Sequence, residues 1–367
     1  MSIADKVPDY IRGIVPYVPG KPIDEVEREY GIRGSAKLAS NENPLGPSPK
    51  AVAALRERLD ELHLYPDGGC FHLRRALSAK LDVAPERLIF GNGSNELIEL
   101  AVRTFLRPGD EALLSQGTFV AYGLALGAMG AAVRTAPLKD FGYDLEAMAR
   151  ALTPKTRCVF LANPNNPTGT IYRRPEWEAF LEQVGPDVLV VADEAYFEYV
   201  DDPDYPDSLD DHREGRAVLT LRTFSKVYGL AGLRVGYAIA HPEIVAMMNQ
   251  VREPFNVSAA AQWAATAAVD DTEHLRRSLE VNRQGLAFLA EGLAAMGVDW
   301  VPSQANFVLV RTGQVGRVFE ELQRRGVIVR PVGPEFPEHV RVTVGTPDEN
   351  RKFLDGLSRI LEGGGAG

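Results

Sequence analysis

The chain has 367 residues, is 45% hydrophobic and 25% charged, and carries a formal net charge of −10. This length exceeds what one hydrophobic core usually serves, so we expect two lobes. Nucleic-acid binding is disfavoured, because affinity for a phosphate backbone needs clustered positive charge and no Lys/Arg block here is longer than a pair.

Cysteine and histidine usage excludes further classes of protein. Cys70 and Cys158 lie far apart without C-x-x-C spacing, which is typical of reduced cytosolic thiols rather than a disulfide framework. The six histidines show no metal-ligand spacing, so no bound metal is expected. Apolar runs stay below the roughly 20 residues of a membrane span, and the first ten residues lack the apolar core of a signal peptide. We therefore expect a cytoplasmic protein without a membrane partner.

The first segment, Met1–Leu45, is rich in proline and glycine, with a short helical pattern only at Asp24–Tyr30. Such an arm cannot build its own core and must pack on something else, for example a second subunit. Leucines at helical spacing then predict a helix over Ser48–Leu62. After a turn at Tyr65–Gly69, a second helix is expected through Leu73–Leu81.

From Arg87 onward, apolar strands alternate with helices, which indicates a parallel sheet covered on both faces. One helix follows the turn at Gly91–Asn95, and another is expected at Pro175–Val184. The predicted strands are Leu88–Phe90, Glu111–Ser115, Ala131–Ala136, Cys158–Leu161, Val188–Ala192 and Ala217–Leu221.

After about Arg252 the composition shifts, and a long helix is predicted over Thr272–Met296, stopped by Gly297. Beyond it we expect a smaller α+β lobe and a disordered tail at Gly363–Gly367. Its strands are predicted at Asn306–Val310, Val327–Val329 and Val340–Val344, and its helices at Gln314–Arg325 and Pro347–Leu361. The expected division is an N-terminal arm with part of the small lobe (1–45), a large lobe (46–253) and a small lobe (254–367).

The stretch Leu219–Gly236 concentrates chemistry-bearing side chains. Lys226 follows a buried strand, where desolvation disfavours the ammonium form, and a neutral amine suits Schiff-base chemistry. Thr223, Ser225 and Arg234 are what a phosphate monoester would need nearby. A surface lysine in a loop is the competing interpretation.

Two glycine- and proline-rich turns follow predicted strands, and each has a structural interpretation beside a ligand-binding one. Gly91–Glu96 lacks the third glycine of a dinucleotide loop, but it opens a helix whose free N–H groups suit a phosphate. Asn163–Gly169 is a rigid turn that can aim the Asn166 amide at a ring oxygen.

Asp193 ends a predicted central strand, where ligands bind in open α/β sheets. A carboxylate buried there needs a cation, and a protonated pyridine nitrogen would serve. Tyr196 would then lie near a phenolic oxygen of the ring. Asp193 could instead be a helix cap, and Phe119 could be either core or a ring that stacks on a planar cofactor.

Motifs over nearly the whole chain resemble fold-type-I pyridoxal-phosphate enzymes, specifically class II aminotransferases, and most closely the histidinol-phosphate aminotransferases. This resemblance implies an α/β fold: a large lobe with a mostly parallel seven-stranded sheet, plus a smaller α+β lobe. The motifs are KLASNENPLGPSP (37–49), YPDGG (65–69), GNGSNELIEL (91–100), NPNNPTG (163–169), DEAY (193–196), RTFSKVYGLAGLRVGY (222–237) and VRVTVGTPDEN (340–350).

The resemblance also implies pyridoxal 5'-phosphate as cofactor and a role for each site residue. Lys226 would condense with the cofactor aldehyde and later move a proton. Asp193 would pair with the ring nitrogen, while Asn166 and Tyr196 would contact the phenolic oxygen and Phe119 would stack on the ring. The phosphate would be held by Ser94, Asn95, Thr223, Ser225 and Arg234, and by Tyr65 of a neighbouring subunit, which implies a homodimer with shared sites.

For the substrates, the resemblance implies that Arg341 binds an α-carboxylate, with Arg330 and Tyr17 near the distal phosphate. Two departures bear on specificity. The ring-stacking position is usually tyrosine and here is Phe119, and Pro331–Pro334 is shared with relatives that also accept aromatic amino acids.

The expected activity is transamination between histidinol phosphate and 2-oxoglutarate, which yields imidazole acetol phosphate and glutamate in histidine biosynthesis. One alternative is an aromatic-amino-acid aminotransferase; a decarboxylating or phosphate-cleaving relative is a further one. A non-enzymatic cofactor-binding protein, as in regulators with a fused helix-turn-helix domain, is disfavoured because residues 1–45 are too short and proline-rich. A nucleotide-dependent oxidoreductase is disfavoured by the missing third glycine.

Overall fold

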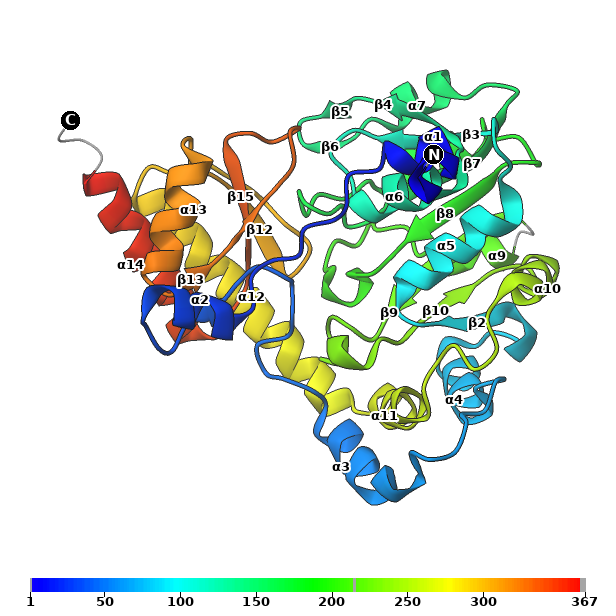
Figure 1. Ribbon diagram of the computed structural model, residues 1–367, viewed down its shortest axis with the longest axis horizontal. Helices are drawn as coiled ribbons and strands as arrows, with labels where there is room; N and C mark the ends of the chain where they lie inside the picture. The colour runs from blue at the N-terminus through cyan, green and yellow to red at the C-terminus, as the bar shows by residue number, and fades with distance from the viewer. Residues whose placement is uncertain (1, 214–215, 364–367) are drawn as a thin grey trace.

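A seven-stranded sheet forms the centre of the larger lobe in the computed structural model, which describes residues 2–213 and 216–363 (Figure 1). The strand order is β2-β10-β9-β8-β7-β3-β4, and every pairing is parallel except the two that β10 makes. The strands are β2 (Leu88–Gly91), β3 (Glu111–Ser115), β4 (Ala132–Ala136), β7 (Thr156–Ala162), β8 (Leu189–Asp193), β9 (Val218–Thr223) and β10 (Gly236–Ile239). The predicted mostly parallel seven-stranded sheet is confirmed.

Strand β10 is the element of this sheet that the sequence did not predict. It returns antiparallel to β9 and inserts between β9 and β2, with Gly236 opposite both Thr223 and Gly91. An antiparallel neighbour needs no helical crossover, so the loop after Lys226 leads straight back into the sheet.

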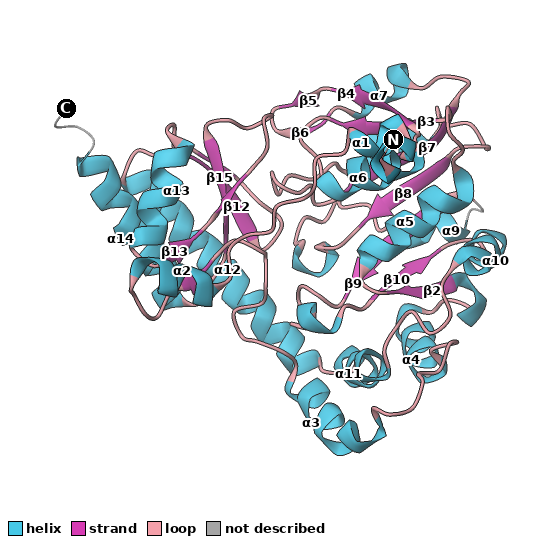
Figure 2. Ribbon diagram, in the orientation of Figure 1, coloured by secondary structure: helices cyan, strands magenta, loops and turns pink. Residues whose placement is uncertain are grey.

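Helices cover both faces of the large sheet (Figure 2). Alternate residues of β3 serve opposite faces: Ala112 and Leu114 belong to the core under α5, α6 and α10, whereas Leu113 belongs to the core under α7 and α8. The helices of this lobe are α3 (Pro49–Arg58), α4 (Phe71–Leu81), α5 (Ser94–Phe105), α6 (Val120–Met129), α7 (Leu145–Ala151), α8 (Arg174–Leu181), α9 (Leu209–Arg213) and α10 (Pro242–Val251). Helix α11 (Ala259–Val269), which the expected division assigned to the small lobe, packs on α3 and α4 of the large lobe.

The smaller lobe is built on a four-stranded antiparallel sheet of order β11-β12-β15-β14. Its elements are β11 (Trp300–Val301), β12 (Phe307–Arg311), β14 (Arg330–Pro331), β15 (His339–Thr343), α12 (Thr272–Ala295), α13 (Val315–Arg324) and α14 (Pro347–Gly363). The predicted strands and helices of this lobe are confirmed within a few residues. Of the tail predicted to be disordered, residues 364–367 lie outside the described residues.

The N-terminal arm contacts both lobes of its own chain. Helix α1 (Asp9–Arg12) lies against α6, and β1 (Ala36–Lys37) pairs in parallel with β13 (Val327–Ile328). Helix α2 (Ile23–Tyr30) packs Val26 against the same part of the small lobe. The arm therefore ties the lobes together before the chain enters α3.

Short elements complete the chain. The predicted helix over Ser48–Leu62 is α3 followed by a 3-10 turn rather than one helix.

No helix within the described ranges is both long and apolar enough to cross a membrane. The short elements are the hairpin β5 (Leu138–Lys139) and β6 (Gly142–Tyr143) and the 3-10 turns Ile3–Lys6, Leu59–Glu61, Pro85–Arg87, Phe197–Tyr199 and Ala231–Leu233.

Candidate functional site

One cavity of about 260 Å³ is lined by the carboxyl ends of β8 and β9, the N-terminus of α5, the loop after β7 and strands β14 and β15 of the small lobe. All the site residues predicted from the sequence line this cavity, with the single exception of Tyr65. They are Tyr17, Ser94, Asn95, Phe119, Asn166, Asp193, Tyr196, Thr223, Ser225, Lys226, Arg234, Arg330 and Arg341.

Asp193 contributes a buried carboxylate to the cavity from the end of β8. Its Oδ2 accepts a hydrogen bond from the Tyr122 hydroxyl at 2.7 Å, and its Oδ1 accepts one from the Ala195 N–H at 3.2 Å. Burial raises the pKa of Asp193, while Tyr122, the Ala195 amide and Lys226 oppose that rise. A cation placed beside this carboxylate would offset its desolvation, as a protonated ring nitrogen would.

Lys226 lies in the loop after β9, lines the cavity and is half-buried. Its Nζ donates to the Ser40 carbonyl at 3.3 Å and lies 5.5 Å from the centre of the Tyr196 ring. The Tyr196 hydroxyl accepts hydrogen bonds from two amides, Asn41 at 2.8 Å and Asn166 at 3.4 Å. An amine, a phenol and two amides therefore converge on the same space.

A group of side chains suited to bind an anion, here called the anion cradle, lies at the N-terminus of α5 and consists of Ser94, Asn95, Thr223, Ser225 and Arg234. Gly93 caps this helix with φ +76°, and a Cβ there would overlap the Arg234 guanidinium. A Cβ on Gly236 would come within 2.6 Å of the Ser94 amide nitrogen. The glycines thus let a guanidinium and free helix N–H groups approach one point, the arrangement that binds phosphate.

Hydroxyl groups complete this cradle. Thr223 Oγ1 donates to Ser225 Oγ at 3.0 Å, and Arg234 Nη1 reaches Ser225 Oγ at 3.5 Å. The same Arg234 nitrogen donates to the Ala231 carbonyl at 3.0 Å, which holds the guanidinium in place. The predicted phosphate ligands are therefore gathered on one side of the cavity.

Arg341 projects from β15 of the small lobe and is buried. It donates to Asn166 Oδ1 and to the Ala39 carbonyl, both at 2.6 Å, while its Nε has no partner. Burial lowers the pKa of Arg341. A guanidinium held by neutral acceptors, with its Nε–H unused, suits an incoming anion.

Arg330, on β14 next to Arg341 on β15, also lines the cavity, and its guanidinium carbon lies 4.9 Å from the centre of the Tyr17 ring. Two arginines from the small lobe thus face the phenol, the amides and the lysine from the large lobe.

Among the described residues, no group of three or more His, Cys, Asp or Glu side chains is arranged to hold a metal ion.

The predicted aromatic residues lie in different places. Phe119 lines the cavity and meets the Tyr122 ring edge-on, with 5.6 Å between the ring centres. Tyr65 instead lies outside the cavity, 84% exposed, and stacks on Phe255 at 5.0 Å. Within one chain, Tyr65 therefore takes no part in the site.

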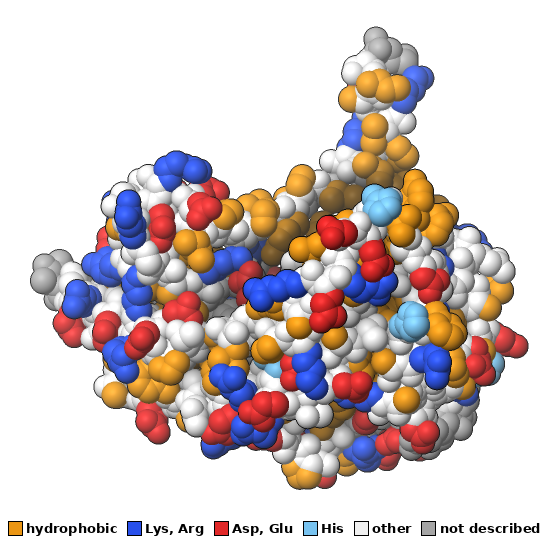
Figure 3. Space-filling model, turned by 90° about the horizontal axis from the view of Figure 1, so that it is seen from below, with side chains coloured by type: hydrophobic (Ala, Val, Ile, Leu, Met, Phe, Trp, Pro, Cys, Tyr) orange, Lys and Arg blue, Asp and Glu red, His pale blue; other side chains and the backbone are white. Residues whose placement is uncertain are grey.

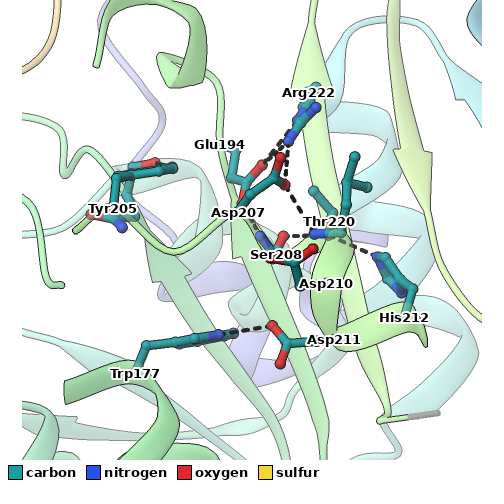
Figure 4. A network of polar contacts seen from close by, with 12 residues as sticks. Trp177, Glu194, Tyr205, Asp207, Ser208, Asp210, Asp211, His212, Thr220 and Arg222 are labelled. Atoms are coloured by element: carbon teal, nitrogen blue, oxygen red, sulfur yellow. Dashed lines mark hydrogen bonds and ion pairs between the residues drawn. The ribbon is translucent and has the colours of Figure 1, made fainter. Parts of the chain in front are cut away.

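A buried polar network lies behind the ends of β8 and β9 (Figure 4). Arg222 forms ion pairs with Glu194 at 2.7 Å and with Asp207 at 2.9 Å, and Glu194 Oε1 accepts from the Ser208 N–H at 3.1 Å. Burial alone would lower the pKa of Arg222, but the Glu194 carboxylate raises it, so this arginine stays charged. Because Glu194 follows Asp193 and Arg222 precedes Thr223, the pair joins the two strands that carry the site.

The network continues through neutral groups (Figure 4). Thr220 Oγ1 lies 2.5 Å from Ser208 Oγ and 2.9 Å from His212 Nε2. Burial lowers the pKa of His212 to about 4, so its ring is neutral near pH 7. Trp177 Nε1 donates to Asp211 at 2.8 Å beside this group. These contacts hold residues 208–212 against Thr220 of β9 and Trp177 of α8.

Sequence reasoning missed several residues at the cavity. Tyr122, which holds Asp193, lies one helical turn beyond Phe119 on α6, so helical spacing from Phe119 could have identified it. Asn41 and Ser40 belong to the motif at residues 37–49, whose side chains were given no individual roles. No pattern in the sequence pairs Glu194 with Arg222.

Known proteins are similar to this chain in sequence and fold. Residues 34–357 match the family described as aminotransferase class I and II. The chain is 53% identical to the histidinol-phosphate aminotransferase of Anaeromyxobacter sp., over 97% of this chain and 99% of that protein. It is 51% identical to histidinol-phosphate aminotransferase 1 of Nitrosococcus oceani, over 96% of each.

Solved structures of aminotransferases have a similar fold. The histidinol-phosphate aminotransferase of Sinorhizobium meliloti, in complex with pyridoxal-5'-phosphate, superposes with a TM-score of 0.90 at 26% identity, covering 98% of each chain. The aspartate aminotransferase of Thermus thermophilus with maleate has a TM-score of 0.82 at 26% identity, over 97% of this chain and 99% of that one. The chain therefore belongs to the class I and II aminotransferases.

Proposed function

We propose that this chain is a pyridoxal-phosphate-dependent aminotransferase that transfers the amino group of histidinol phosphate to 2-oxoglutarate, as a step of histidine biosynthesis. The observation that carries the proposal is the single cavity in which Lys226, Asp193, the anion cradle at Ser94 and two arginines of the small lobe meet. The names of the close relatives support the same substrate.

The residues present fit the cofactor by charge and shape. The cradle of Ser94, Asn95, Thr223, Ser225 and Arg234 would hold its phosphate, Asp193 would lie beside its ring nitrogen, and Phe119 would cover the ring. Asn166 and Tyr196 would contact its ring oxygen. When bound, pyridoxal phosphate supplies an aldehyde that condenses with amines and a cationic ring that accepts electrons from the substrate carbon.

Lys226 is both the nucleophile and the base in the proposed reaction. Its Nζ would act first as a nucleophile toward a carbonyl and then, released, as the base that takes a proton from the amino-bearing carbon of the substrate. Its bond to the Ser40 carbonyl holds the amine on the cavity side of the loop. Since donor and acceptor alternate at one lysine, the kinetics should be ping-pong.

The two arginines bind the anionic ends of both substrates. Glutamate and 2-oxoglutarate would place one carboxylate on Arg341 and the other on Arg330. Histidinol phosphate has no carboxylate, so the expectation that Arg341 grips an α-carboxylate applies to the acids alone. Its phosphate would lie between Arg341, Arg330 and Tyr17, which are within reach of one another in the cavity.

The experiment that tests this function compares kcat/KM for histidinol phosphate and for phenylalanine in the wild type and in Arg330→Ala. We expect the wild type to prefer histidinol phosphate. Truncating Arg330 should lower kcat/KM for histidinol phosphate by about 10²-fold, because an ionic contact to the phosphate is lost. Phenylalanine, which lacks that anion, should change by less than about threefold.

Arg324→Ala is the matched control, because Arg324 is an exposed arginine on α13 that pairs with Glu320 away from the cavity. It should leave both substrates unaffected. A wild type that prefers phenylalanine would instead make the chain an aromatic-amino-acid aminotransferase.

We further propose a homodimer with shared sites. Apolar side chains are exposed around Tyr65, including Leu59, Leu62, Leu64 and Phe71, and such a patch marks an interaction surface. The beginning of the N-terminal arm projects from the body of the molecule (Figure 3), and apolar residues of the arm, including Ile3, Val15 and Val18, are exposed. A second copy covering these surfaces could bring its own Tyr65 to the cradle of this chain.

Mixing two inactive variants tests the shared site. We expect Tyr65→Ala and Lys226→Ala to be impaired when each is assayed alone. A heterodimer of the two variants has one site with both Lys226 and the partner's Tyr65 intact. The refolded mixture should therefore be more active than the two variants' separate activities added together. A monomer by sedimentation, or a mixture without gain, would contradict this arrangement.

A further inference from the structure

Residues 39–43, here called the crossing segment, pass between the lobes on the way from β1 to α3. Its groups touch the site at several points: the Ala39 carbonyl accepts from Arg341, the Ser40 carbonyl accepts from Lys226, and Asn43 Nδ2 donates to the Val227 carbonyl at 2.7 Å. The crossing segment is therefore part of the wall that holds the reactive side chains.

Asn41 is the most constrained residue of this segment. It is 1% exposed and has φ +57°, a left-handed conformation that asparagine tolerates. Its N–H donates to Thr343 Oγ1 at 3.0 Å, and its Oδ1 accepts from the same hydroxyl at 2.9 Å. Its carbonyl accepts from Asn306 Nδ2 at 3.0 Å. These bonds leave Nδ2, which donates to the Tyr196 hydroxyl at 2.8 Å.

The bonding at Tyr196 determines where its own proton goes. A phenol has one proton to donate and accepts through its oxygen lone pairs. Asn41 Nδ2 and Asn166 Nδ2 both donate to this oxygen and cannot accept from it. The Tyr196 proton is therefore used by neither amide, and the remaining direction is the cavity that Tyr196 lines.

We infer that Asn41 is a positioning residue that directs the Tyr196 hydroxyl proton into the cavity, toward the ring oxygen of the cofactor. Thr343 holds the amide in this orientation from β15, the strand that also carries Arg341. The inference rests on the proposed function, because it needs pyridoxal phosphate in the cavity.

Asn41→Asp tests the inference with little change of shape. Aspartate also tolerates the left-handed conformation, but it presents an accepting oxygen where Asn41 presents a donor, so the Tyr196 proton would turn away from the cavity. A hydrogen bond donated to an oxygen that becomes anionic favours the anionic form. Losing this bond should therefore raise the midpoint pH at which the visible absorbance of the bound cofactor titrates.

We expect a rise of about one pH unit in that midpoint and a fall of about tenfold in kcat/KM, within the range of pairwise coupling between residues in contact. When Asn41→Asp is made in Tyr196→Phe, the midpoint should move by less than about 0.3 pH unit and kcat/KM should fall by less than about twofold, because there is then no hydroxyl to direct. Asn41→Gly removes the donor without backbone strain and adds no acceptor, so it should shift the midpoint in the same direction but by less than Asn41→Asp does.

Asn306→Ala is the control for a purely structural role, because it removes the bond to the Asn41 carbonyl and leaves the side-chain amide in place. It should lower the thermal unfolding midpoint and leave the spectral midpoint unchanged. An Asn41→Asp shift of equal size in the Tyr196→Phe background, or no shift in either, would overturn the inference. A wild type that gains no visible band with pyridoxal phosphate would refute the proposed function instead.

Discussion

Lys226→Ala is expected to lower kcat for histidinol phosphate by about 10⁵-fold or more, the scale seen when a covalent nucleophile is removed. Lys226 is the lysine that lines the cavity, with its amine directed by the Ser40 carbonyl. Alanine leaves the cavity without any amine for the carbonyl or the proton. The measurement is single-turnover mixing of cofactor-loaded protein with histidinol phosphate, followed by absorbance.

Lys80→Ala is the matched control for that loss. Burial lowers the pKa of Lys80, and its amine donates to the Val269 carbonyl, but this lysine lies away from the cavity. Its removal should leave kcat within about threefold of the wild type, because no contact with substrate or cofactor is changed. A Lys226→Ala enzyme as active as Lys80→Ala would contradict the assignment.

Asp193→Asn should have the second largest effect, a loss of about 10³-fold in kcat, comparable to the loss of one preorganised charged or donating group in a buried site. The substitution keeps the shape of a buried side chain and removes its charge. The ring nitrogen would then lose the anion that keeps it cationic. Steady-state kcat at saturating cofactor measures the loss, and near-normal activity would argue against Asp193 as the partner.

Tyr122→Phe gives a graded companion to that experiment. The Tyr122 hydroxyl is a donor that opposes the burial-driven rise in the pKa of Asp193. Removing it raises that pKa further, so more of the carboxyl is protonated as the pH falls. We expect a loss of about tenfold that grows toward acidic pH. A loss independent of pH would show that Tyr122 acts by packing alone.

Local pattern explains why most of the fold could be predicted. Most of β7 (Cys158–Ala162) and of β8 (Leu189–Ala192) is a continuous apolar run, and α12 carries leucines at helical spacing up to a terminating glycine. Strand β10 was missed because its four residues, Gly236–Ile239, follow a turn-rich segment and pair antiparallel within a sheet expected to be parallel.

Site residues could be predicted from the sequence only where they belong to a recognisable motif. Asp193, Asn166 and Lys226 lie in compact motifs at strand ends, which meet at one edge of the sheet. Tyr122 meets Asp193 across 71 positions of sequence, and Asn41 meets Tyr196 across 155. Helical spacing from Phe119 can mark Tyr122 as a neighbour of the cavity, but which residues Tyr122 and Asn41 contact depends on how the arm and the helices pack.

The most direct test of this account is reductive trapping of the wild-type chain with pyridoxal phosphate. We predict a visible absorbance band on addition of the cofactor, loss of that band with borohydride, and a pyridoxyl adduct on the peptide that contains Lys226. No band and no adduct, or an adduct confined to another lysine such as Lys80, would contradict the claim that Lys226 is the amine that reacts with the cofactor.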